Sequence, residues 1–192
     1  MSELAIVPLA AAHISQLPSL ILGYTTSEKY RIERQETPEE VVFRLQLIRL
    51  PEPVRISYSH LDETELARYA GLANNGCCFV ALNEEQLVGV VIAEPQAWNN
   101  VLNVWEFHVA PDFQRRGVGR LLMGRLVETA VSLQLRALMC ETQSLNVPAI
   151  RFYRKMGFTL DGIDLSYYTN EDYDPTQNVA IFMKYKIPDV GK

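Results

Sequence analysis

Cysteine and histidine are scarce in this sequence, which limits the chemistry that it can support. Three residues of each type occur among the 192: Cys77, Cys78, Cys140, His13, His60 and His108. An odd number of cysteines, two of them adjacent, fits reduced thiols better than a disulfide framework. None of these residues shows the spacing of a metal site. We therefore expect a cytoplasmic chain with reduced cysteines and no bound metal.

Positive charge and long apolar runs are also in short supply. Lys and Arg total 18 against 23 Asp and Glu, a net charge of −5, so we do not expect the basic surface of a nucleic-acid-binding protein. No apolar run approaches the ~18–20 residues that span a bilayer, and residues 1–17 lack the basic start of a signal peptide. We expect no nucleic acid and no membrane as partner; a cationic small molecule suits the charge better.

The chain is long and apolar enough, at 48% hydrophobic residues, for one domain with a sizeable core. In its first third we expect a strand at 4–7, a helix at 10–22 that Pro18 interrupts, strands at 30–34, 43–50 and 54–59, and a helix at 62–72. Alternating apolar residues favour the strand at 43–50. Thr37-Pro38-Glu39-Glu40 is typical of a helix start and favours a helix at 39–50 instead. The sequence leaves these two alternatives open.

The pattern becomes clearer from Gly76 onwards. It predicts a hairpin of strands 77–82 and 87–93, a loop at 94–100, a strand at 101–109, a helix at 119–133, a strand at 137–141, a helix at 148–156, and strands beginning at 158 and 179. On the first of these helices, Leu122, Leu126, Ala130 and Leu133 share one face. This order predicts an α/β (α+β) fold with a mixed sheet and helices on its faces.

One segment, VWEFHVAPDFQRRGVGR at 104–120, has the pattern of an anion site. A strand ends at Val109, and a turn rich in arginine and glycine leads into a helix. Glycines let backbone N–H groups approach a phosphate, and a helix N-terminus supplies about half a positive charge. The alternative is a tight turn whose arginines simply face water. The segment is neither a P-loop nor a dinucleotide-binding fingerprint, because it has no GxxxxGK[ST] and no third glycine or downstream acid in place.

A second motif follows about thirty residues later, N-x-x-A-x-x-F-Y-x-x-x-G-F at 146–158. Together with QRRGVG at 114–119 it resembles the GNAT-type N-acetyltransferases. AWNN at 97–100, ETQSLNVPAIRFYRKMGF and GIDLSYYTN are similar to the streptothricin acetyltransferase branch. The resemblance implies acetyl-CoA as cosubstrate and a mixed, mostly antiparallel sheet splayed open around it, with helices on both faces. It also implies a single domain over 1–192, with variable substrate-side elements at 1–75 and a coenzyme-binding core at 76–187.

The resemblance assigns residues to the coenzyme. The pyrophosphate would be held by Gln114, Arg115, Arg116, Gly117, Val118, Gly119 and Arg120, and the acetyl and pantetheine groups by the strand at Phe107, His108 and Val109. Asn146 would bind the pantetheine arm, unless it only caps a helix. Tyr153 would contact the coenzyme and protonate the leaving thiolate, unless it only packs against Phe158.

The base that deprotonates the amine is expected on the strand at 101–109. Glu106 and His108 have the same strand parity, so both can face one cleft, and histidine titrates near neutral pH. The alternative is a solvated strand face. The streptothricin-like enzymes tend to carry an acidic pair on this strand, where this chain has Trp105-Glu106. Trp105 should point to the opposite face unless a bulge intervenes, and the departure bears on a polycationic acceptor rather than on acetyl transfer.

Further residues are candidates for the acceptor amine. Substrate contacts are expected from Glu106, Trp98, Tyr167 and Tyr168, within or near an acidic and aromatic segment that contains Asp161, Asp164, Glu171, Asp172, Tyr173 and Asp174. Such a segment could hold an ammonium group through charge and cation–π attraction, or it could be a solvated hairpin loop. Cys140 is expected in a strand core, and one of Cys77 and Cys78 is expected to be partly exposed, because they alternate faces.

The sequence therefore predicts an acetyl-CoA-dependent acetyltransferase in which a primary amine attacks the thioester directly in a ternary complex. The leading acceptor is a streptothricin-like or other cationic small molecule. A peptide amine, either an N-terminus or a lysine, and a small metabolite amine are the alternatives. A non-catalytic acyl-CoA-binding module and a nucleotide-phosphate enzyme are the other classes. A homodimer would be in keeping with the family.

Overall fold

A computed structural model describes residues 4–59, 61–169 and 178–188. Its strands form a seven-stranded sheet of order β1-β4-β5-β6-β7-β9-β8 and a two-stranded sheet, β2-β3. The larger sheet is mixed and mostly antiparallel, so the predicted fold class is confirmed. The chain divides into two compact units, one of residues 1–22, 58–140 and 184–192 and the other of residues 23–57 and 141–183. The division into parts at 1–75 and 76–187 stays a prediction.

The first unit is built on antiparallel neighbours. Its strands are β1 (Leu4–Pro8), β4 (Phe79–Asn83), β5 (Gln86–Gln96) and β6 (Val101–Val109), and the beginning of β7 (Ala137–Gln143) pairs with β6 in parallel. The hairpin of β4 and β5 was expected from the polar turn between two apolar runs, and β6 has the predicted bounds. β5 is longer than predicted, because its last residues keep pairing with β6 up to Gln96 and Val101.

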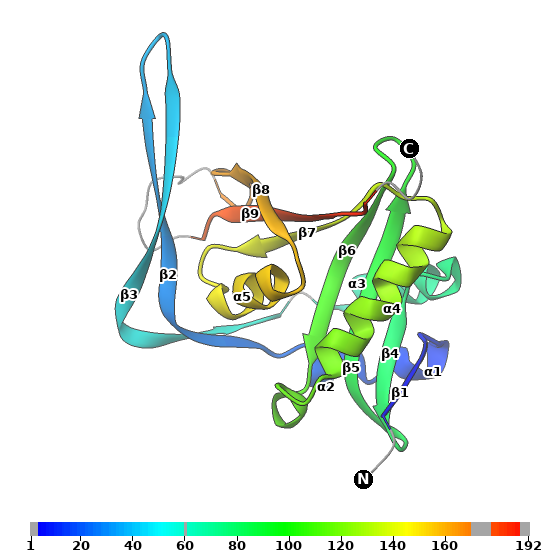
Figure 1. Cartoon of the computed structure of the whole chain (residues 1–192). Coiled ribbons are helices and arrows are strands. Elements are labelled where there is room, and N and C mark those ends of the chain that lie inside the picture. Colours follow the sequence, from blue (N-terminus) through cyan, green and yellow to red (C-terminus); the bar gives the residue numbers. More distant parts are fainter. Residues whose placement is uncertain (1–3, 60, 170–177, 189–192) are drawn as a thin grey trace. The chain divides into compact units, whose positions relative to one another are not determined.

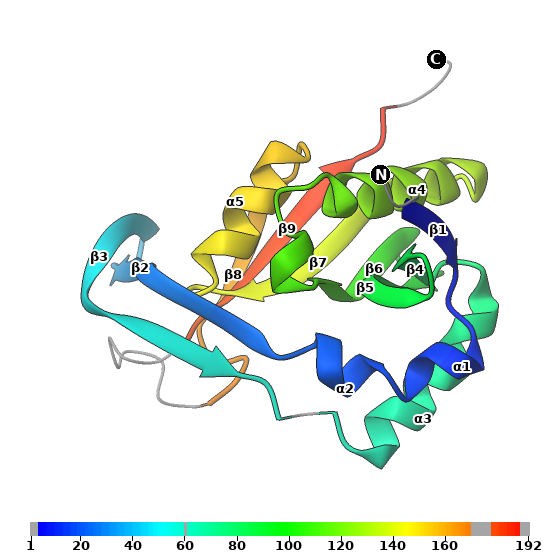
Figure 2. The same ribbon diagram turned by 90° about the horizontal axis from the view of Figure 1, so that it is seen from below.

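Helices cover both faces of this sheet (Figures 1 and 2). The 15-residue helix α4 (Val118–Ser132) lies on one face, and α1 (Ala11–Ile14), α2 (Leu17–Leu20) and α3 (Glu63–Leu72) lie on the other. The short 3₁₀ turns are η1 (Ala73–Asn75) and η2 (Pro111–Phe113). Pro18 lies in the first turn of α2, where its missing N–H has no helical partner to lose. The expected interrupted helix is therefore two separate ones.

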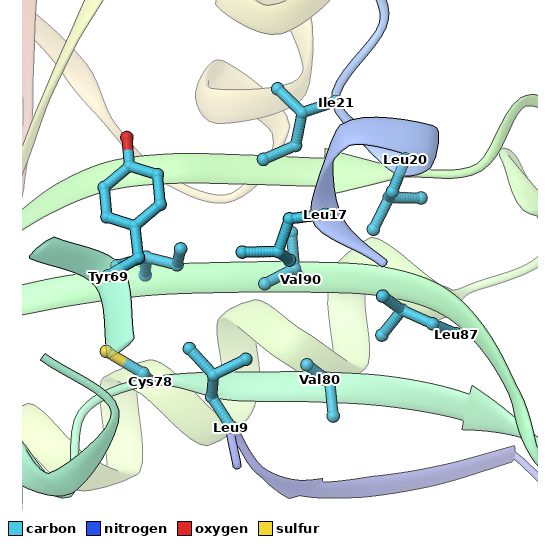
Figure 3. Packing of buried hydrophobic residues seen from close by; sticks show 10 residues of the cluster. Leu9, Leu17, Leu20, Ile21, Tyr69, Cys78, Val80, Leu87 and Val90 are labelled. Atoms are coloured by element: carbon cyan, nitrogen blue, oxygen red, sulfur yellow. The ribbon is translucent and has the colours of Figure 1, made fainter. Parts of the chain in front are cut away.

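Apolar side chains of α2 and the chain beside it fill the space above β4 and β5 (Figure 3). The cluster includes Leu9, Leu17, Leu20, Ile21, Tyr69, Cys78, Val80, Leu87, Val90 and Ile92. Because helices cover both faces of the sheet, Cys77 and Cys78 are both buried, and the expectation that one is partly exposed was wrong. Cys140 is buried as predicted.

The predicted apolar face of α4 is correct except at its end. Leu122, Leu126 and Ala130 are fully buried, whereas Leu133 is 47% exposed. The helix ends at Ser132, so Leu133 is the C-cap residue and has left the helical periodicity that the face assumed.

The second unit contains the long hairpin of β2 (Gly23–Glu36) and β3 (Val41–Ser57), together with α5 (Val147–Lys155), β8 (Thr159–Asp164) and the larger part of β9 (Ala180–Lys186). The helix considered at 39–50 does not form. Thr37 Oγ1 accepts from the Glu40 amide at 3.1 Å, and the Thr37 amide donates to the Glu40 carbonyl at 2.8 Å. The residues that resemble a helix start therefore close the hairpin turn.

β3 is one strand rather than the two that were predicted. The register with β2 shifts between Thr26 and Glu28, where the partners pass from Val54 to Arg49. Pro51 and Pro53 lie within this irregularity, where the amide that proline lacks is not needed for the ladder. The prolines therefore mark a bulge and not the end of the strand.

Candidate active site

A bulge in β6 sets the orientation of the candidate base. Ile92 pairs with Glu106 and Ala93 with Val104, so Trp105 is the extra residue between two paired ones. We expected Trp105 to point to the face opposite Glu106 unless a bulge intervened, and the bulge is present. With the bulge, the side chains of both residues reach α3. The Arg68 guanidinium lies 4.2 Å from the centre of the Trp105 ring, and the Tyr69 hydroxyl contacts Glu106.

Glu106 is buried and holds two polar partners. The Tyr69 hydroxyl donates to Oε1 at 2.7 Å, and His108 Nε2 lies 2.6 Å from Oε2. The glutamate is 8% exposed, so this part of β6 is not a solvated face. The ring of His108 also makes an edge contact with Tyr58 at a centroid distance of 5.8 Å. The predicted juxtaposition of Glu106 and His108 is confirmed, and their catalytic role stays a prediction.

The protonation state of Tyr69 follows from this environment. Burial raises the pKa of its hydroxyl, and the negative charge of Glu106 raises it further. Tyr69 therefore keeps its hydroxyl proton throughout the ordinary pH range and remains a hydrogen-bond donor to Glu106.

The ladder between β6 and β7 ends inside β6. It joins Val101–Val104 to Ala137–Cys140, whereas the ladder with β5 continues to Val109. The residues predicted to bind the acetyl and pantetheine groups, Phe107, His108 and Val109, lie beyond that end. The sheet thus has the interruption that the coenzyme prediction requires at this point of β6.

The basic turn at 114–120 begins α4 without a side-chain cap. Gly117 is the N-cap residue, with φ of +91° that favours glycine, and no side chain in the described chain caps the helix there. By contrast, Asp62 caps α3 and Asn146 caps α5 through their side-chain oxygens. Arg115, Arg116 and Arg120 are exposed around this end. The first amides of α4 are therefore left for another acceptor.

Neighbouring residues fix the position of this turn. Gln114 Nε2 donates to the Val109 carbonyl at 3.2 Å, and the Arg116 guanidinium lies 5.4 Å from the centre of the Phe113 ring. On β5, a Cβ at Gly89 would lie 3.0 Å from Leu122 and 3.1 Å from Val118. The absence of a side chain at Gly89 thus lets the first turns of α4 lie close to the sheet.

In the second unit, Tyr153 and Asn146 both have structural contacts. Tyr153 is 6% exposed, and its ring lies 5.2 Å from Phe158 and 5.6 Å from Phe152. Asn146 Oδ1 accepts from the Ala149 amide at 3.2 Å. Packing and capping, which the sequence offered as alternatives to their roles at the coenzyme, are thus present. Neither contact excludes those roles, which stay predictions.

The aromatic residues expected near the acceptor differ in surroundings. The Tyr168 hydroxyl donates to Glu141, and Tyr167 makes edge contacts with Tyr168 and Phe182 at 5.3 and 5.6 Å. Burial, and next the charge of Glu141, raise the pKa of both tyrosines. Part of the predicted acidic segment lies outside the described residues: Glu171, Asp172, Tyr173 and Asp174.

Trp98 does not lie with the other candidates of its unit. It is 84% exposed in the turn that connects β5 to β6. Glu106 follows the first residue of β6 by five positions, which is about 17 Å along a strand. The structure therefore separates Trp98 from the buried carboxylate, and its role in substrate binding stays a prediction.

Sequence reasoning missed Tyr69 and Tyr58. The helix that carries Tyr69 was expected at 62–72, and on the same helix the partly buried Leu66 also packs against the core. A tyrosine on the buried face of a helix must give its hydroxyl a partner. This observation could have marked Tyr69, but the partner lies 37 residues later and no local pattern names it.

The described residues give no indication of two other kinds of site. No group of three or more His, Cys, Asp or Glu side chains is arranged there to hold a metal ion. Among the helices of the same residues, none has the length and apolar character of a membrane span.

The model of the acetyltransferase (GNAT) family matches residues 41–158. The chain belongs to this family. Streptothricin acetyltransferase A of Bacillus subtilis (strain 168) is 37% identical over 90 residues, 46% of this chain and 50% of the relative. The chain thus spans about half the length of the curated relatives that it matches first.

Solved structures extend the likeness of this GNAT family member to nearly the whole chain. A nourseothricin acetyltransferase superposes with a TM-score of 0.77 at 27% identity, over 96% of this chain and 99% of that one. A structure from Bacillus anthracis str. Ames, in complex with acetyl coenzyme A, gives 0.74 at 22% identity, over 96% and 100%. The second comparison bears on the fold alone.

Proposed function

We propose that this protein transfers an acetyl group from acetyl-CoA to a primary amine of a cationic, streptothricin-like small molecule. The observation that carries the proposal is the contact of the buried Glu106 with the half-buried His108, on the segment of β6 that lies past the end of the ladder with β7. A carboxylate and an imidazole held together in this way, beside the end of the ladder, suit proton transfer next to a bound thioester.

The residues of the basic turn fit the pyrophosphate of the coenzyme. The uncapped amides of α4 and the positive end of the helix dipole favour an anion. Arg115, Arg116 and Arg120 add three positive charges where the dipole alone would disfavour them. Past the end of the ladder with β7, the backbone of β6 would bind the acetyl and pantetheine groups.

Proton transfer is assigned to groups of this chain. An amine acceptor arrives mainly as an ammonium ion and must lose a proton before its nitrogen can attack the acetyl carbon. The pair of Glu106 and His108 would take that proton, directly or through a water molecule. Tyr153 would donate its hydroxyl proton to the thiolate as the carbon–sulfur bond breaks, and Asn146 would bind the pantetheine arm.

The acceptor class follows from charge and from the relatives. The chain has a net charge of −5, and the aromatic residues Tyr167 and Tyr168 lie beside Glu141. Such surroundings attract an ammonium group. The proteins that share 37% and 35% identity over about half of the chain are named for streptothricin. Trp105, stacked under Arg68, is the local departure from an acidic pair.

The test measures release of free thiol from acetyl-CoA with a panel of amines that comprises streptothricin, a linear polyamine, lysine and a peptide with a free N-terminal alanine. We expect streptothricin to give a kcat/KM at least about 10-fold above that of the peptide, a difference of about 1.4 kcal/mol in transition-state binding. Preference for the peptide would make the protein a peptide acetyltransferase. Tight binding of acetyl-CoA without thiol release from any amine would favour a non-catalytic acyl-CoA-binding module. A thermal shift with ATP and none with coenzyme A would favour a nucleotide-phosphate enzyme.

Tyr153→Phe tests the acid within the same assay. The variant should lower kcat by about 10- to 100-fold and leave the Kd of acetyl-CoA unchanged. Tyr30→Phe is the matched control, since it removes a hydroxyl that accepts from Arg154 of the same helix at 2.9 Å. An unchanged kcat in Tyr153→Phe would remove this residue from the mechanism.

A further inference from the structure

The contacts of Glu106 indicate which member of the Glu106–His108 pair accepts the proton and which one orients its neighbour. Both carboxylate oxygens have a partner, Tyr69 at Oε1 and His108 at Oε2, and the side chain is 9% exposed. A carboxylate that took the proton itself would have to give up one of these bonds in a buried site, which is costly. Glu106 is therefore better suited to orient a neighbour than to accept the proton.

His108 is that neighbour. Its side chain is more exposed, at 17%, and only Nε2 is used by the carboxylate. In the part of the chain that the structure describes, Nδ1 makes no hydrogen bond. A neutral imidazole whose Nε2–H is held by a carboxylate presents the lone pair of Nδ1 as acceptor.

We propose that Tyr69, on α3, is a positioning residue that fixes Glu106, which in turn orients His108 so that His108 Nδ1 takes the proton of the acceptor amine. The inference rests on the proposed function and names the base of that site. The ammonium N–H bond breaks and its proton forms a bond to Nδ1. Nε2–H stays on Glu106, and the carboxylate balances the charge of the imidazolium. The amine lone pair that is released can then form the bond to the acetyl carbon.

Tyr69 is well placed to hold this arrangement. It is 2% exposed and belongs to the cluster with Leu9, Cys78 and Ile92, so packing restrains its ring beside the carboxylate. The helix is fixed at its beginning by Asp62, whose side chain accepts from the Glu65 amide at 2.9 Å. Beside the hydroxyl, Glu65 and Arg68 of α3 are the other charged groups, and Tyr58 faces the imidazole. The hydrogen bond of the Tyr69 hydroxyl thus links the hydrophobic core to the carboxylate of Glu106.

Tyr69→Phe keeps the buried ring and removes only the donor to Oε1. We expect kcat to fall by about 10- to 100-fold, the size of a hydrogen bond to a charged group, with KM for acetyl-CoA unchanged. The acid limb of the pH profile of kcat should move to higher pH. The hydroxyl stabilises the pair more when His108 is neutral, because the carboxylate is then not balanced by an imidazolium. Its removal therefore favours the protonated pair.

If Tyr69 had only a structural role, its replacement would change Tm but not kcat or the pH profile. Leu9→Val reduces packing in the same cluster and should lower Tm without moving the pH profile. If Tyr69→Phe also lowers Tm alone, with kcat and the pH profile unchanged, the positioning role is wrong. His108→Gln should abolish most of the rate; a rate close to that of the parent protein would make Glu106 the direct acceptor and overturn the assignment of Nδ1.

A second measurement does not depend on turnover. An NMR titration of the imidazole signals, with that of His108 assigned from its loss in His108→Gln, should give a higher midpoint for His108 in Tyr69→Phe than in the parent chain. An equal midpoint would overturn the inference whether or not an acceptor has been found. Absence of thiol release from the parent protein, in contrast, counts against the proposed function and leaves the measured coupling of Tyr69 to His108 intact.

Discussion

The turn at 114–120 and the strand segment at 106–108 lie in the same compact unit and carry charge in opposite ways. In the turn, Arg115, Arg116 and Arg120 are exposed, and among the described residues they form no ion pair. In the strand segment, Glu106 is 8% exposed and holds a tyrosine and a histidine at 2.7 and 2.6 Å. The arginines of the turn thus have no carboxylate partner among the described residues, whereas Glu106 of the strand segment is already hydrogen-bonded within the protein.

This difference separates binding from chemistry. Exposed arginines and uncapped helix amides gain a charged partner when an anion binds, so changes there should alter the affinity for the coenzyme. Glu106 and His108 are already hydrogen-bonded and need no ligand to be arranged, so changes there should alter kcat and stability. Three predictions test this contrast, beginning with the largest effect.

Replacing the buried carboxylate should have the largest effect. Glu106→Gln keeps the shape and removes the charge that balances the imidazolium, so we expect kcat to fall by about 100- to 1000-fold. KM for acetyl-CoA should stay within about 2-fold, because the turn at 114–120 is untouched. Steady-state kinetics with acetyl-CoA varied at a fixed amine concentration measure both constants.

Glu94→Gln is the matched control for this variant. Glu94 lies on the neighbouring strand and accepts from Trp105 Nε1 at 2.9 Å, so the variant removes one nearby negative charge and leaves His108 its carboxylate. A loss of kcat as large as that in Glu106→Gln would mean that the general charge of the site, and not the buried pair, supports the reaction.

The second prediction concerns stability at high pH. Burial raises the pKa of the Cys78 thiol to about 11, and it raises the pKa of Tyr69 above its ordinary value of 10. Above about pH 9 the unfolded chain loses these protons while the folded chain keeps them, so the free energy of unfolding falls as pH rises. For Cys78 the loss should be on the order of 2 kcal/mol by pH 11.

Urea unfolding at pH 8, 9.5 and 11, followed by tryptophan fluorescence, measures this loss. Cys78→Ala should flatten the curve between pH 9 and 11. Arg116→Ala should leave its slope unchanged, because an arginine does not titrate in this range. Parallel curves for the parent protein and Cys78→Ala would show that the buried thiol does not carry the effect.

Local patterns predicted the parts of the fold that local physics controls. The parity of strand positions predicted that Glu106 and His108 lie on one face, and the residue types before α4 predicted the glycine turn. Thr37 shows the limit of this reasoning. Its side chain could begin a helix or close a hairpin, and pairing of β2 with β3 over many residues decided for the hairpin.

Of the candidate site, the sequence predicted only the contact between residues of one strand, Glu106 and His108 of β6. Trp105 turned toward α3 because of a bulge, and a bulge depends on the register with β5, which the sequence of β6 alone does not contain. Tyr69 reaches Glu106 from another helix, 37 residues earlier. Contacts between elements distant in sequence follow from packing, so sequence patterns could not supply the residue that holds the carboxylate.

The smallest effect should come from two glycines at the beginning and in the middle of α4. A Cβ would meet nothing within 4 Å at either Gly117 or Gly124, so space does not distinguish them. The backbone does. Gly117 has φ of +91°, where alanine is strained, so Gly117→Ala should destabilise the fold by about 1 kcal/mol. Gly124 lies within the helix, and Gly124→Ala should stabilise it by about 0.5–1 kcal/mol. Thermal unfolding measures both shifts, while KM for acetyl-CoA should rise only in Gly117→Ala, because only that residue shapes the amides offered to the pyrophosphate. Equal KM values for the two variants would mean that the turn does not bind the coenzyme. The assignment of binding to the turn, as opposed to the chemistry of Glu106 and His108, would then be wrong.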